Sequence, residues 1–177
     1  MAPRWRRRAI LALALLGVLA GAALLAAVSF APVMFRVARV EGQAMAPTLR
    51  DQDRLLVNKI AYLEKRPQRG DIVMMHYPLN PARLFVKRVI AHPGDRLHIR
   101  DGRVYVNGEA YDDSYVSPEF RGASNWGPEV VPDGHYFVMG DRRNNSSDSR
   151  HWGFVPARYI VGRVTARWWP LADARRY

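Results

Sequence analysis

Lys87 is the residue whose type and position point most directly to chemistry. It lies in the segment FVKRVI (85–90), where the two-residue period of a strand places it beside Phe85 and Val89 on one face. If that face is buried, loss of water around the amine lowers its pKa, and a neutral lysine can act as a general base. The alternative is a lysine whose stem lies along the sheet while its amine reaches solvent.

A second concentration of polar side chains occupies the segment GDRRNNSSDSR (140–150). Its hydroxyls and carboxylates could orient a catalytic group, and they could equally cap turns. The chain has no cysteine, which excludes a thiol nucleophile, disulfides and thiolate metal sites. Its five histidines, at positions 76, 92, 98, 135 and 151, show no paired metal-binding spacing, so we expect no metal site and no cofactor.

Basic charge is the next feature, because the 177 residues carry a formal net charge of +11. Such a balance is typical of proteins that meet nucleic acid or an anionic membrane surface. Four arginines lie within residues 1–8, and the other 23 basic residues, set against all 16 acidic ones, leave +7 on residues 31–177. That remainder shows no Lys/Arg stripe with interleaved aromatics, so we expect no nucleic-acid partner.

The N-terminal segment predicts a membrane anchor. Residues 9–30 are 22 continuous apolar or small residues, about 33 Å long as a helix, which matches a hydrocarbon core of about 30 Å. The arginines of residues 1–8 favour a cytoplasmic tail, so residues 31–177 would form one extracytoplasmic domain of a single-pass protein of the cell membrane. The alternative is a secretory signal cleaved near Ala27 and Ser29, although the apolar part of such signals is usually about 7–15 residues long.

Residues 31–177 are expected to form a mainly β domain of antiparallel sheets. Asp101-Gly102 separates LHIR from RVYV and predicts a hairpin, and Asn107-Gly108 predicts the next turn. Residues 53–62 could be a strand running into a short helix, and residues 112–134 lack periodicity and predict a surface loop. Short apolar runs of strand character, bounded by turn residues, recur at 36–42, 70–78, 84–95, 135–141 and 159–170.

Four blocks of the sequence together resemble the type I signal peptidases, which are membrane-anchored serine endopeptidases with a Ser–Lys dyad. The blocks are VEGQAMAPTLRDQDRLLVNK (40–59), RGDIVMMHYP (69–78), LFVKRVIAHPGDRLHIRDGRVYVNG (84–108) and GHYFVMGDRRNNSSDSRHWGFVP (134–156). They cover most of residues 31–177 in the family's order and spacing. The resemblance implies a mostly antiparallel β fold and cleavage of exported preproteins at their signal peptides, typically after Ala-x-Ala.

The resemblance also implies roles for individual residues. Lys87 would be the general base, and Ser146 would hydrogen-bond to it and orient it. Gly42 would help to shape the oxyanion hole together with the backbone amide of residue 44, and Met45 would belong to the same substrate-binding region. The remaining residues would be structural and lie beside the site: Asp148 paired with Arg150, together with Arg88 and Asp141.

The sequence departs from the family at the nucleophile, which is the serine of a Ser-Met-x-Pro-Thr-Leu motif. The corresponding stretch here begins with Ala44, followed by Met-Ala-Pro-Thr-Leu. Alanine has no hydroxyl, so no acyl-enzyme can form through residue 44. A smaller departure is Arg142, where the family commonly has Asn.

Two readings of the function remain open. One is a signal peptidase with impaired cleavage, in which Thr48 or Ser146 could be a substitute nucleophile. The other is a non-catalytic, membrane-anchored protein that binds signal peptides or partners an active paralogue, because a fold does not guarantee a function. Both readings predict signal peptides and the lipid bilayer as partners.

Overall fold

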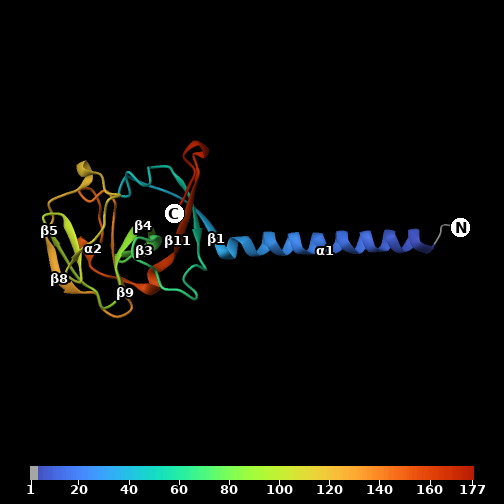
Figure 1. Ribbon diagram of the computed structural model, residues 1–177, viewed down its shortest axis with the longest axis horizontal. Coiled ribbons are helices and arrows are strands. Elements are labelled where there is room, and N and C mark those ends of the chain that lie inside the picture. The colour runs from blue at the N-terminus through green and yellow to red at the C-terminus, as the bar shows by residue number, and fades with distance from the viewer. Residues whose placement is uncertain (1–3) are drawn as a thin grey trace. The chain divides into compact units, whose positions relative to one another are not determined.

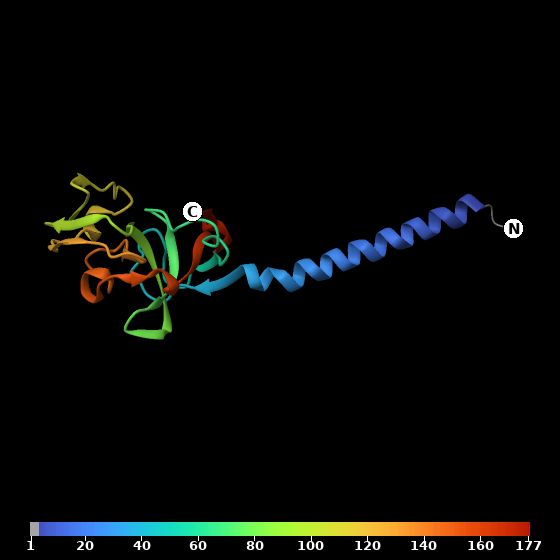
Figure 2. The same ribbon diagram turned by 90° about the horizontal axis from the view of Figure 1, so that it is seen from below.

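The computed structural model describes residues 4–177, and the side chains of residues 4–10, 27, 30 and 31 lie outside that description. The chain divides into two units, one ending at Phe35 and the other running from Arg36 to Tyr177. Helix α1 (Arg4–Met34) forms the first unit and is continuous in both views (Figures 1 and 2). Within the described residues, no helix is both long enough and apolar enough to cross a membrane. The predicted basic tail, residues 1–8, falls on positions or side chains outside the described part.

The second unit consists of two β-sheets. The strand pairings described within each sheet are all antiparallel, which confirms the predicted mainly β fold. The larger sheet has the order β1-β2-β11-β3-β4-β9-β10, with β12 paired to β11. Its strands are β1 (Phe35–Arg39), β2 (Arg54–Asn58), β3 (Ile72–Tyr77), β4 (Asn80–Ala91), β9 (His135–Met139), β10 (Val155–Pro156), β11 (Ile160–Trp169) and β12 (Arg175–Arg176).

The smaller sheet has the order β7-β6-β5-β8, and its strands lie in the sequence between β4 and β9. Its members are β5 (Arg96–Arg100), β6 (Arg103–Val106), β7 (Glu109–Ala110) and β8 (Trp126–Val130), and Figure 1 shows β5 and β8 together at one end of the unit. Helical structure in this unit is limited to α2 (Ser149–Trp152) and the 3-10 turns η1 (Pro118–Phe120), η2 (Ala157–Tyr159) and η3 (Leu171–Asp173).

The predicted hairpin is confirmed, because β5 and β6 pair in register across the Asp101-Gly102 turn. Two expectations are wrong. Residues 59–65 form turns and bends instead of a short helix. The predicted loop 112–134 contains β8, whose Gly127 and Pro128 hide the alternation of a strand; at Gly127 a Cβ atom would come within 2.7 Å of the Leu97 carbonyl oxygen.

Strand β4 and the end strand β1 each have an edge that borders the site. Strand β4 pairs with β3 from Asn80 to Arg88, but it pairs with β9 only from Arg88 to Ala91. Among the described residues, the N-terminal half of β4 therefore has one edge without a strand partner. Strand β1 ends the larger sheet, so one of its edges is likewise unpaired within the described part of the chain.

Candidate active site

Residue 44 lies in a turn that two buried side chains hold against the larger sheet. Met45 and Leu49 are 2% and 0% exposed and pack in a cluster with side chains of β2, β3 and β11. The Leu49 N–H donates to the Met45 carbonyl at 2.9 Å, which closes the turn. Burial of these two apolar side chains fixes the backbone on either side of Ala46 and so fixes the position of Ala44.

The predicted oxyanion-hole segment has one engaged amide and one free amide. Gly42 adopts φ +88°, a conformation that favours glycine, and its N–H donates to the Asp51 carboxylate at 2.8 Å. The Gly42 amide is therefore already satisfied. The Ala44 N–H has no partner among the described residues, so it remains available to an oxygen placed in the site.

Lys87 is buried, as one of the two sequence-based alternatives predicted; the solvent-exposed alternative is wrong. The residue is 3% exposed, and its Nζ lies 5.4 Å from the centre of the Phe85 ring. Burial lowers the pKa of Lys87 to about 8; the Asp148 and Asp141 carboxylates oppose this shift and Arg150 reinforces it. The Lys87 amine donates a hydrogen bond to Ser146 Oγ at 3.2 Å.

Ser146 reaches the lysine because Gly140 has no side chain. A Cβ atom at Gly140 would overlap the Ser146 side chain and the Ala44 carbonyl oxygen. The same loop is joined to the turn by the Arg142 N–H, which donates to the Ala44 carbonyl at 3.0 Å. Sequence reasoning missed Gly140, because a close approach between segments about 100 residues apart has no local signal.

The predicted ion pair Asp148–Arg150 is present and is bidentate. Arg150 Nε and Nη2 each donate to an Asp148 carboxylate oxygen at 2.8 Å. Burial alone would raise the pKa of Asp148, but hydrogen bonds from Arg150 and from the Gly140 N–H hold it below the usual value. The ionised Asp148 also begins helix α2, where its side chain accepts from the Arg150 N–H.

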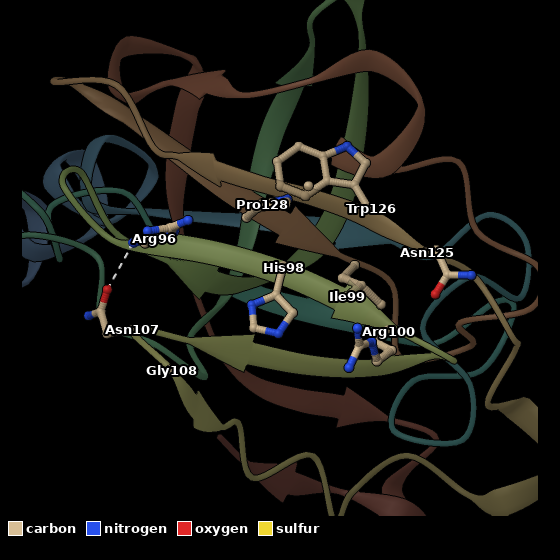
Figure 3. A pocket seen from close by; sticks show the side chains of 10 residues that line it. Arg96, His98, Ile99, Arg100, Asn107, Gly108, Asn125, Trp126 and Pro128 are labelled. Carbon is tan, nitrogen blue, oxygen red and sulfur yellow. Dashed lines mark hydrogen bonds between the residues drawn. The ribbon is translucent and has the colours of Figure 1, made fainter.

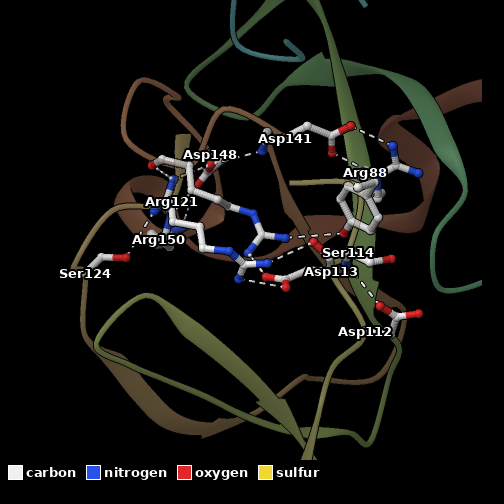
Figure 4. Close-up of polar contacts among 12 residues, drawn as sticks. Arg88, Asp112, Asp113, Ser114, Arg121, Ser124, Asp141, Asp148 and Arg150 are labelled. Carbon is white, nitrogen blue, oxygen red and sulfur yellow. Dashed lines mark hydrogen bonds and ion pairs between the residues drawn. The ribbon is translucent and has the colours of Figure 1, made fainter. Parts of the chain in front are cut away.

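Arg88 and Asp141 form a second pair beside the site. Arg88 donates to the two Asp141 carboxylate oxygens at 2.8 and 2.6 Å (Figure 4). It also donates to the Gly70 carbonyl at 2.8 Å. Its guanidinium lies 4.0 Å from the centre of the Tyr115 ring. This pair ties the start of the 140–150 loop to the residue that follows Lys87 in β4.

A third ion-pair group was not predicted, and it comes from the loop before β8. Asp113 accepts from the buried Arg143 at 3.0 Å and from Arg121 at 2.8 Å (Figure 4). The Arg143 carbonyl in turn accepts from Arg150 at 2.7 Å. Asp113 lies in the aperiodic segment 112–134, where nothing in the sequence distinguishes it from the neighbouring Asp112.

Arg142, at the position where the family commonly has Asn, contacts side chains of two other segments. The Arg142 guanidinium donates to the Gln43 side-chain oxygen and lies 4.9 Å from the centre of the Phe120 ring. Arginine thus joins three segments: the turn of residues 42–49, the 140–150 loop and η1.

A groove of about 580 Å³ contains both Ala44 and Lys87. Its walls come from β1, the following turn and the N-terminal half of β4: Arg36, Val37, Ala38, Arg39, Val40, Glu41, Gly42, Met45, Met74, Ala82, Arg83, Leu84, Phe85, Val86 and Ser147 complete the lining. The free edges of β1 and β4 thus border one space. Two free strand edges with apolar side chains between them can accept an extended peptide as an added strand.

Another cavity, of about 680 Å³, lies over β5 and contains none of the predicted site residues. Figure 3 shows His98 between Arg96 and Arg100, with Trp126 across the cavity. The His98 ring is stacked on Tyr105 with ring centres 4.7 Å apart. No Ser, Thr, Tyr or Lys is among its lining residues, whereas the groove contains Lys87.

The groove defines a class of protein. A buried lysine with a lowered pKa, its serine partner and a groove for an extended peptide would suit a peptide-processing site with a lysine base. The chain matches a known family of that class: the family model "Signal peptidase, peptidase S26" matches residues 11–169.

Relatives of known identity match the same region. Signal peptidase I of Leptolyngbya laminosa is 41% identical over 141 residues, covering 75% of this chain and 68% of the relative. Signal peptidase I of Bacillus caldolyticus is 41% identical over 144 residues, covering 75% and 78%. A crystal structure of a signal peptidase I from Enterococcus faecalis V583 is 33% identical, with a TM-score of 0.48, and covers 57% of this chain and 98% of that one. The chain belongs to the signal peptidase family, peptidase S26, which confirms the resemblance drawn from its sequence blocks.

Proposed function

We propose that this chain recognises the signal peptides of exported preproteins at the outer surface of the cell membrane, and that alanine at position 44 prevents it from cleaving them. One observation carries the proposal. Lys87, a buried amine with a pKa of about 8, lines the same groove as Ala44 and has Ser146 as its hydrogen-bond partner.

The groove would bind the peptide as an extended strand between β1 and β4. Main-chain groups on both free edges would give affinity, and alternate side chains of the peptide would point into the apolar part of the groove. Val37, Ala38 and Val86 offer walls for small apolar side chains. This chemistry suits the small residues that the family cleaves after.

A serine at position 44 would complete the reaction. Lys87 in its neutral form would take the serine proton as the hydroxyl attacks the scissile carbonyl, and it would later activate the water that releases the acyl group. The Ala44 N–H, which is free among the described residues, would donate to the developing oxyanion. Without the hydroxyl no acyl bond forms, and removal of such a nucleophile costs on the order of 10⁶ in kcat.

The two candidate substitute hydroxyls are poorly placed. Thr48 Oγ1 lies 3.5 Å from Arg88 Nη2 and does not line the groove. Ser146 is bonded to Lys87, but it is 9% exposed and also lies outside the groove lining. Ser146 is therefore better suited to orient Lys87 than to attack a bound peptide.

Residues 9–30 would anchor the protein as a single-pass membrane segment, with residues 1–8 in the cytoplasm and residues 31–177 outside. Support comes from the sequence, in which no charged residue occurs between Arg8 and Arg36. Helix α1 includes the whole of this segment.

The test compares three chains on a preprotein with an Ala-x-Ala site: the unmodified chain, Ala44→Ser, and Ala44→Ser with Lys87→Ala. We expect cleavage only by Ala44→Ser, while the unmodified chain binds the preprotein and leaves it intact. Cleavage by the unmodified chain that disappears with Lys87→Ala would contradict the proposal and point to a substitute hydroxyl. Binding without cleavage in all three chains would favour the non-catalytic binding protein.

A further inference from the structure

The outer face of the smaller sheet collects basic side chains. Arg96, His98 and Arg100 alternate with buried residues along β5, so all three point away from the core (Figure 3). On β6, Arg103 and Tyr105 alternate with buried valines in the same way, and the register places Arg103 opposite Arg100 and Tyr105 opposite His98. The three arginines are exposed. Together these five residues form the basic face of the sheet.

The acidic residues of the four strands belong to the other face by register. Glu109 pairs with Val106 and Glu129 pairs with Leu97, and directly opposed residues of antiparallel strands share a face. Val106 and Leu97 are buried in the core beneath the sheet. The basic face therefore receives no acidic side chain from the strands that form it.

Arg100 and Arg103 face each other across the hairpin without a counter-charge. Directly opposed residues of antiparallel strands have Cα atoms about 4.5–5.5 Å apart, and like charges in that position repel. Every ion pair described in the chain joins an arginine to an aspartate, and none includes Arg96, Arg100 or Arg103. Asp101, in the turn between β5 and β6, takes part in none of them either. An anion between the two guanidinium groups would relieve their repulsion.

The cavity over β5 extends along this face. Its volume is about 680 Å³, and its lining includes Arg96, His98 and Arg100 but no Asp or Glu. Asn125 also lines it; the Asn125 Oδ1 accepts from the Asp101 N–H, so the side-chain NH2 group is the part that can donate to a ligand. Arg100 follows Arg96 by four residues, which span about 14 Å along a strand. The cavity therefore suits an elongated ligand with an anionic group toward each end.

A phosphate group suits the pair Arg100 and Arg103 better than a carboxylate does. A carboxylate holds its two oxygens in one plane, where a single guanidinium fork can occupy both. A tetrahedral phosphate directs its oxygens out of one plane, so two guanidinium groups can donate to it from different sides.

The other side chains of this surface favour neither nucleic-acid bases nor lipid. His98 stacks on Tyr105 with ring centres 4.7 Å apart, and Trp126 packs against the core beneath the sheet, whereas stacking of bases needs open aromatic faces. Insertion into lipid needs apolar side chains. Among the described strand residues, the register adds only Ala110 and Val130 of that kind to the basic face.

We propose that the basic face binds a linear polyol phosphate, a chain of phosphodiesters without bases. One phosphate would lie between Arg100 and Arg103, and another would lie near Arg96. The site shares no lining residue with the groove, so the proposal requires neither peptide binding nor cleavage. If residues 31–177 lie outside the cytoplasm, as proposed, the ligand would be a polymer of the cell surface.

The test titrates full-length protein in detergent with a short poly(glycerol phosphate) at physiological ionic strength, by isothermal titration calorimetry. The double variant Arg100→Gln with Arg103→Gln should bind about tenfold more weakly, because exposed charge pairs contribute a few-fold each. The matched control is Arg175→Gln with Arg176→Gln, which removes the same charge from two exposed positions on β12 of the larger sheet. Absence of binding, or equal losses in the two double variants, would overturn the proposal.

Other probes distinguish the sources of negative charge. Glycerol phosphate alone should bind about tenfold more weakly than the chain, because one small anion cannot reach both ends of the cavity. Polyglutamate, an oligodeoxynucleotide and vesicles of anionic phospholipid, compared at equal charge, should also bind more weakly than poly(glycerol phosphate). If any of these probes binds as tightly as the polyol phosphate, the assignment of the ligand is wrong.

Thermal unfolding checks that the variants fold and gives an independent readout. Without ligand, Arg103→Gln should melt no lower than the unmodified chain, since it removes a repulsion. Saturating poly(glycerol phosphate) should raise the melting temperature of the unmodified chain and of the β12 double variant, but it should raise that of Arg100→Gln with Arg103→Gln much less. A rise of the same size in both double variants would contradict the proposed site.

Discussion

Lys87 lies where burial makes its positive charge unfavourable. The Phe85 ring lies on one side of the amine, and Ser146 provides its hydrogen bond. The two nearest carboxylates are already paired, Asp148 with Arg150 and Asp141 with Arg88. They raise the lysine pKa less than free carboxylates would, so burial remains the dominant cause and the pKa stays at about 8.

The lysine pKa predicts the pH dependence of the repaired enzyme. Below pH 8 Lys87 is protonated and cannot accept the serine proton, so kcat/KM of Ala44→Ser should fall about tenfold per pH unit. Above pH 8 the rate should level off, with a half-maximal value near pH 8. Initial rates on an Ala-x-Ala substrate between pH 6 and pH 10 measure this profile. A midpoint above pH 10 would show that the amine is not desolvated.

Gly140 gives a second prediction at the level of one residue. Gly140→Ala should displace Ser146 or the Ala44 carbonyl, because the added Cβ overlaps both. We expect a loss of about 1–3 kcal/mol in the free energy of unfolding, typical of overpacking, and a weaker Lys87–Ser146 contact. Gly122→Ala is the control, since its Cβ would meet Asn144 at an ordinary 3.5 Å. Equal unfolding midpoints in denaturant for the two variants would contradict the expected overlap.

The sequence predicts part of this site and not the rest. Strand periodicity alone places Lys87 on a face with Phe85 and Val89, and burial of that face follows from ordinary physics. The close approach of Gly140 to the Ala44 carbonyl oxygen depends on packing between distant segments. No local pattern encodes such contacts, so only the structure shows them.

At the level of elements, the 140–150 loop is held by arginines on three sides. Arg88 from β4 pairs with Asp141 at its start, Arg150 pairs with Asp148 near its end, and Arg143 in its middle reaches Asp113 in the loop before η1. Buried ion pairs of this kind contribute little net stability but strongly penalise the loss of one partner. The loop of residues 111–125 is therefore part of what positions Ser146.

Asp113→Asn tests this connection. The change leaves the buried Arg143 without its counter-charge, and we expect a loss of about 3 kcal/mol in the free energy of unfolding. Asp112→Asn is the matched control: Asp112 is exposed, its one described side-chain bond is from the Ser114 N–H, and an amide oxygen can accept that bond (Figure 4). Thermal unfolding should separate the two variants. Indistinguishable melting curves would mean that the Asp113 group does not hold the loop.

The free edges of β1 and β4 predict how a bound peptide uses its backbone. In an added strand, successive N–H groups point in opposite directions. With β1 on one side and β4 on the other, every N–H within the groove therefore has a strand partner. N-methylation of any single amide within the groove should weaken binding about tenfold or more, as expected for a lost buried hydrogen bond, and N-methylation of an amide outside the groove should have little effect. Titration of a set of singly methylated peptides measures the pattern. Equal effects inside and outside the groove would contradict strand addition.

The elements themselves were largely predictable, because most strands carry alternation and are separated by turn residues. The hairpin β5–β6 follows from Asp-Gly alone. Strand β8 was not predictable, since Gly127 and Pro128 interrupt its pattern and its pairing with β5 supplies the structure that propensity does not.

The net charge of the whole molecule and its apolar segment, residues 9–30, suggest two different modes of membrane binding. The formal charge of +11 would attract any anionic surface, and salt screens that attraction beyond about 8 Å at physiological ionic strength. The uncharged segment of residues 9–30 would instead act through burial of apolar surface, which salt does not weaken. The two contributions can be separated by experiment.

The proposed anchor of residues 9–30 can be tested by reconstitution. Full-length protein reconstituted with vesicles should remain in the pellet after high-salt and alkaline washes and be released by detergent. Replacing Leu16 and Leu19 by arginine adds two positive charges within residues 9–30, at a cost of about 2.5–3.5 kcal/mol each at the centre of a bilayer. If the apolar segment anchors the chain, this variant should be lost from the pellet despite its higher charge. If electrostatic attraction holds the protein, the variant should bind more tightly and salt should release both forms, which would overturn the proposed single-pass anchor.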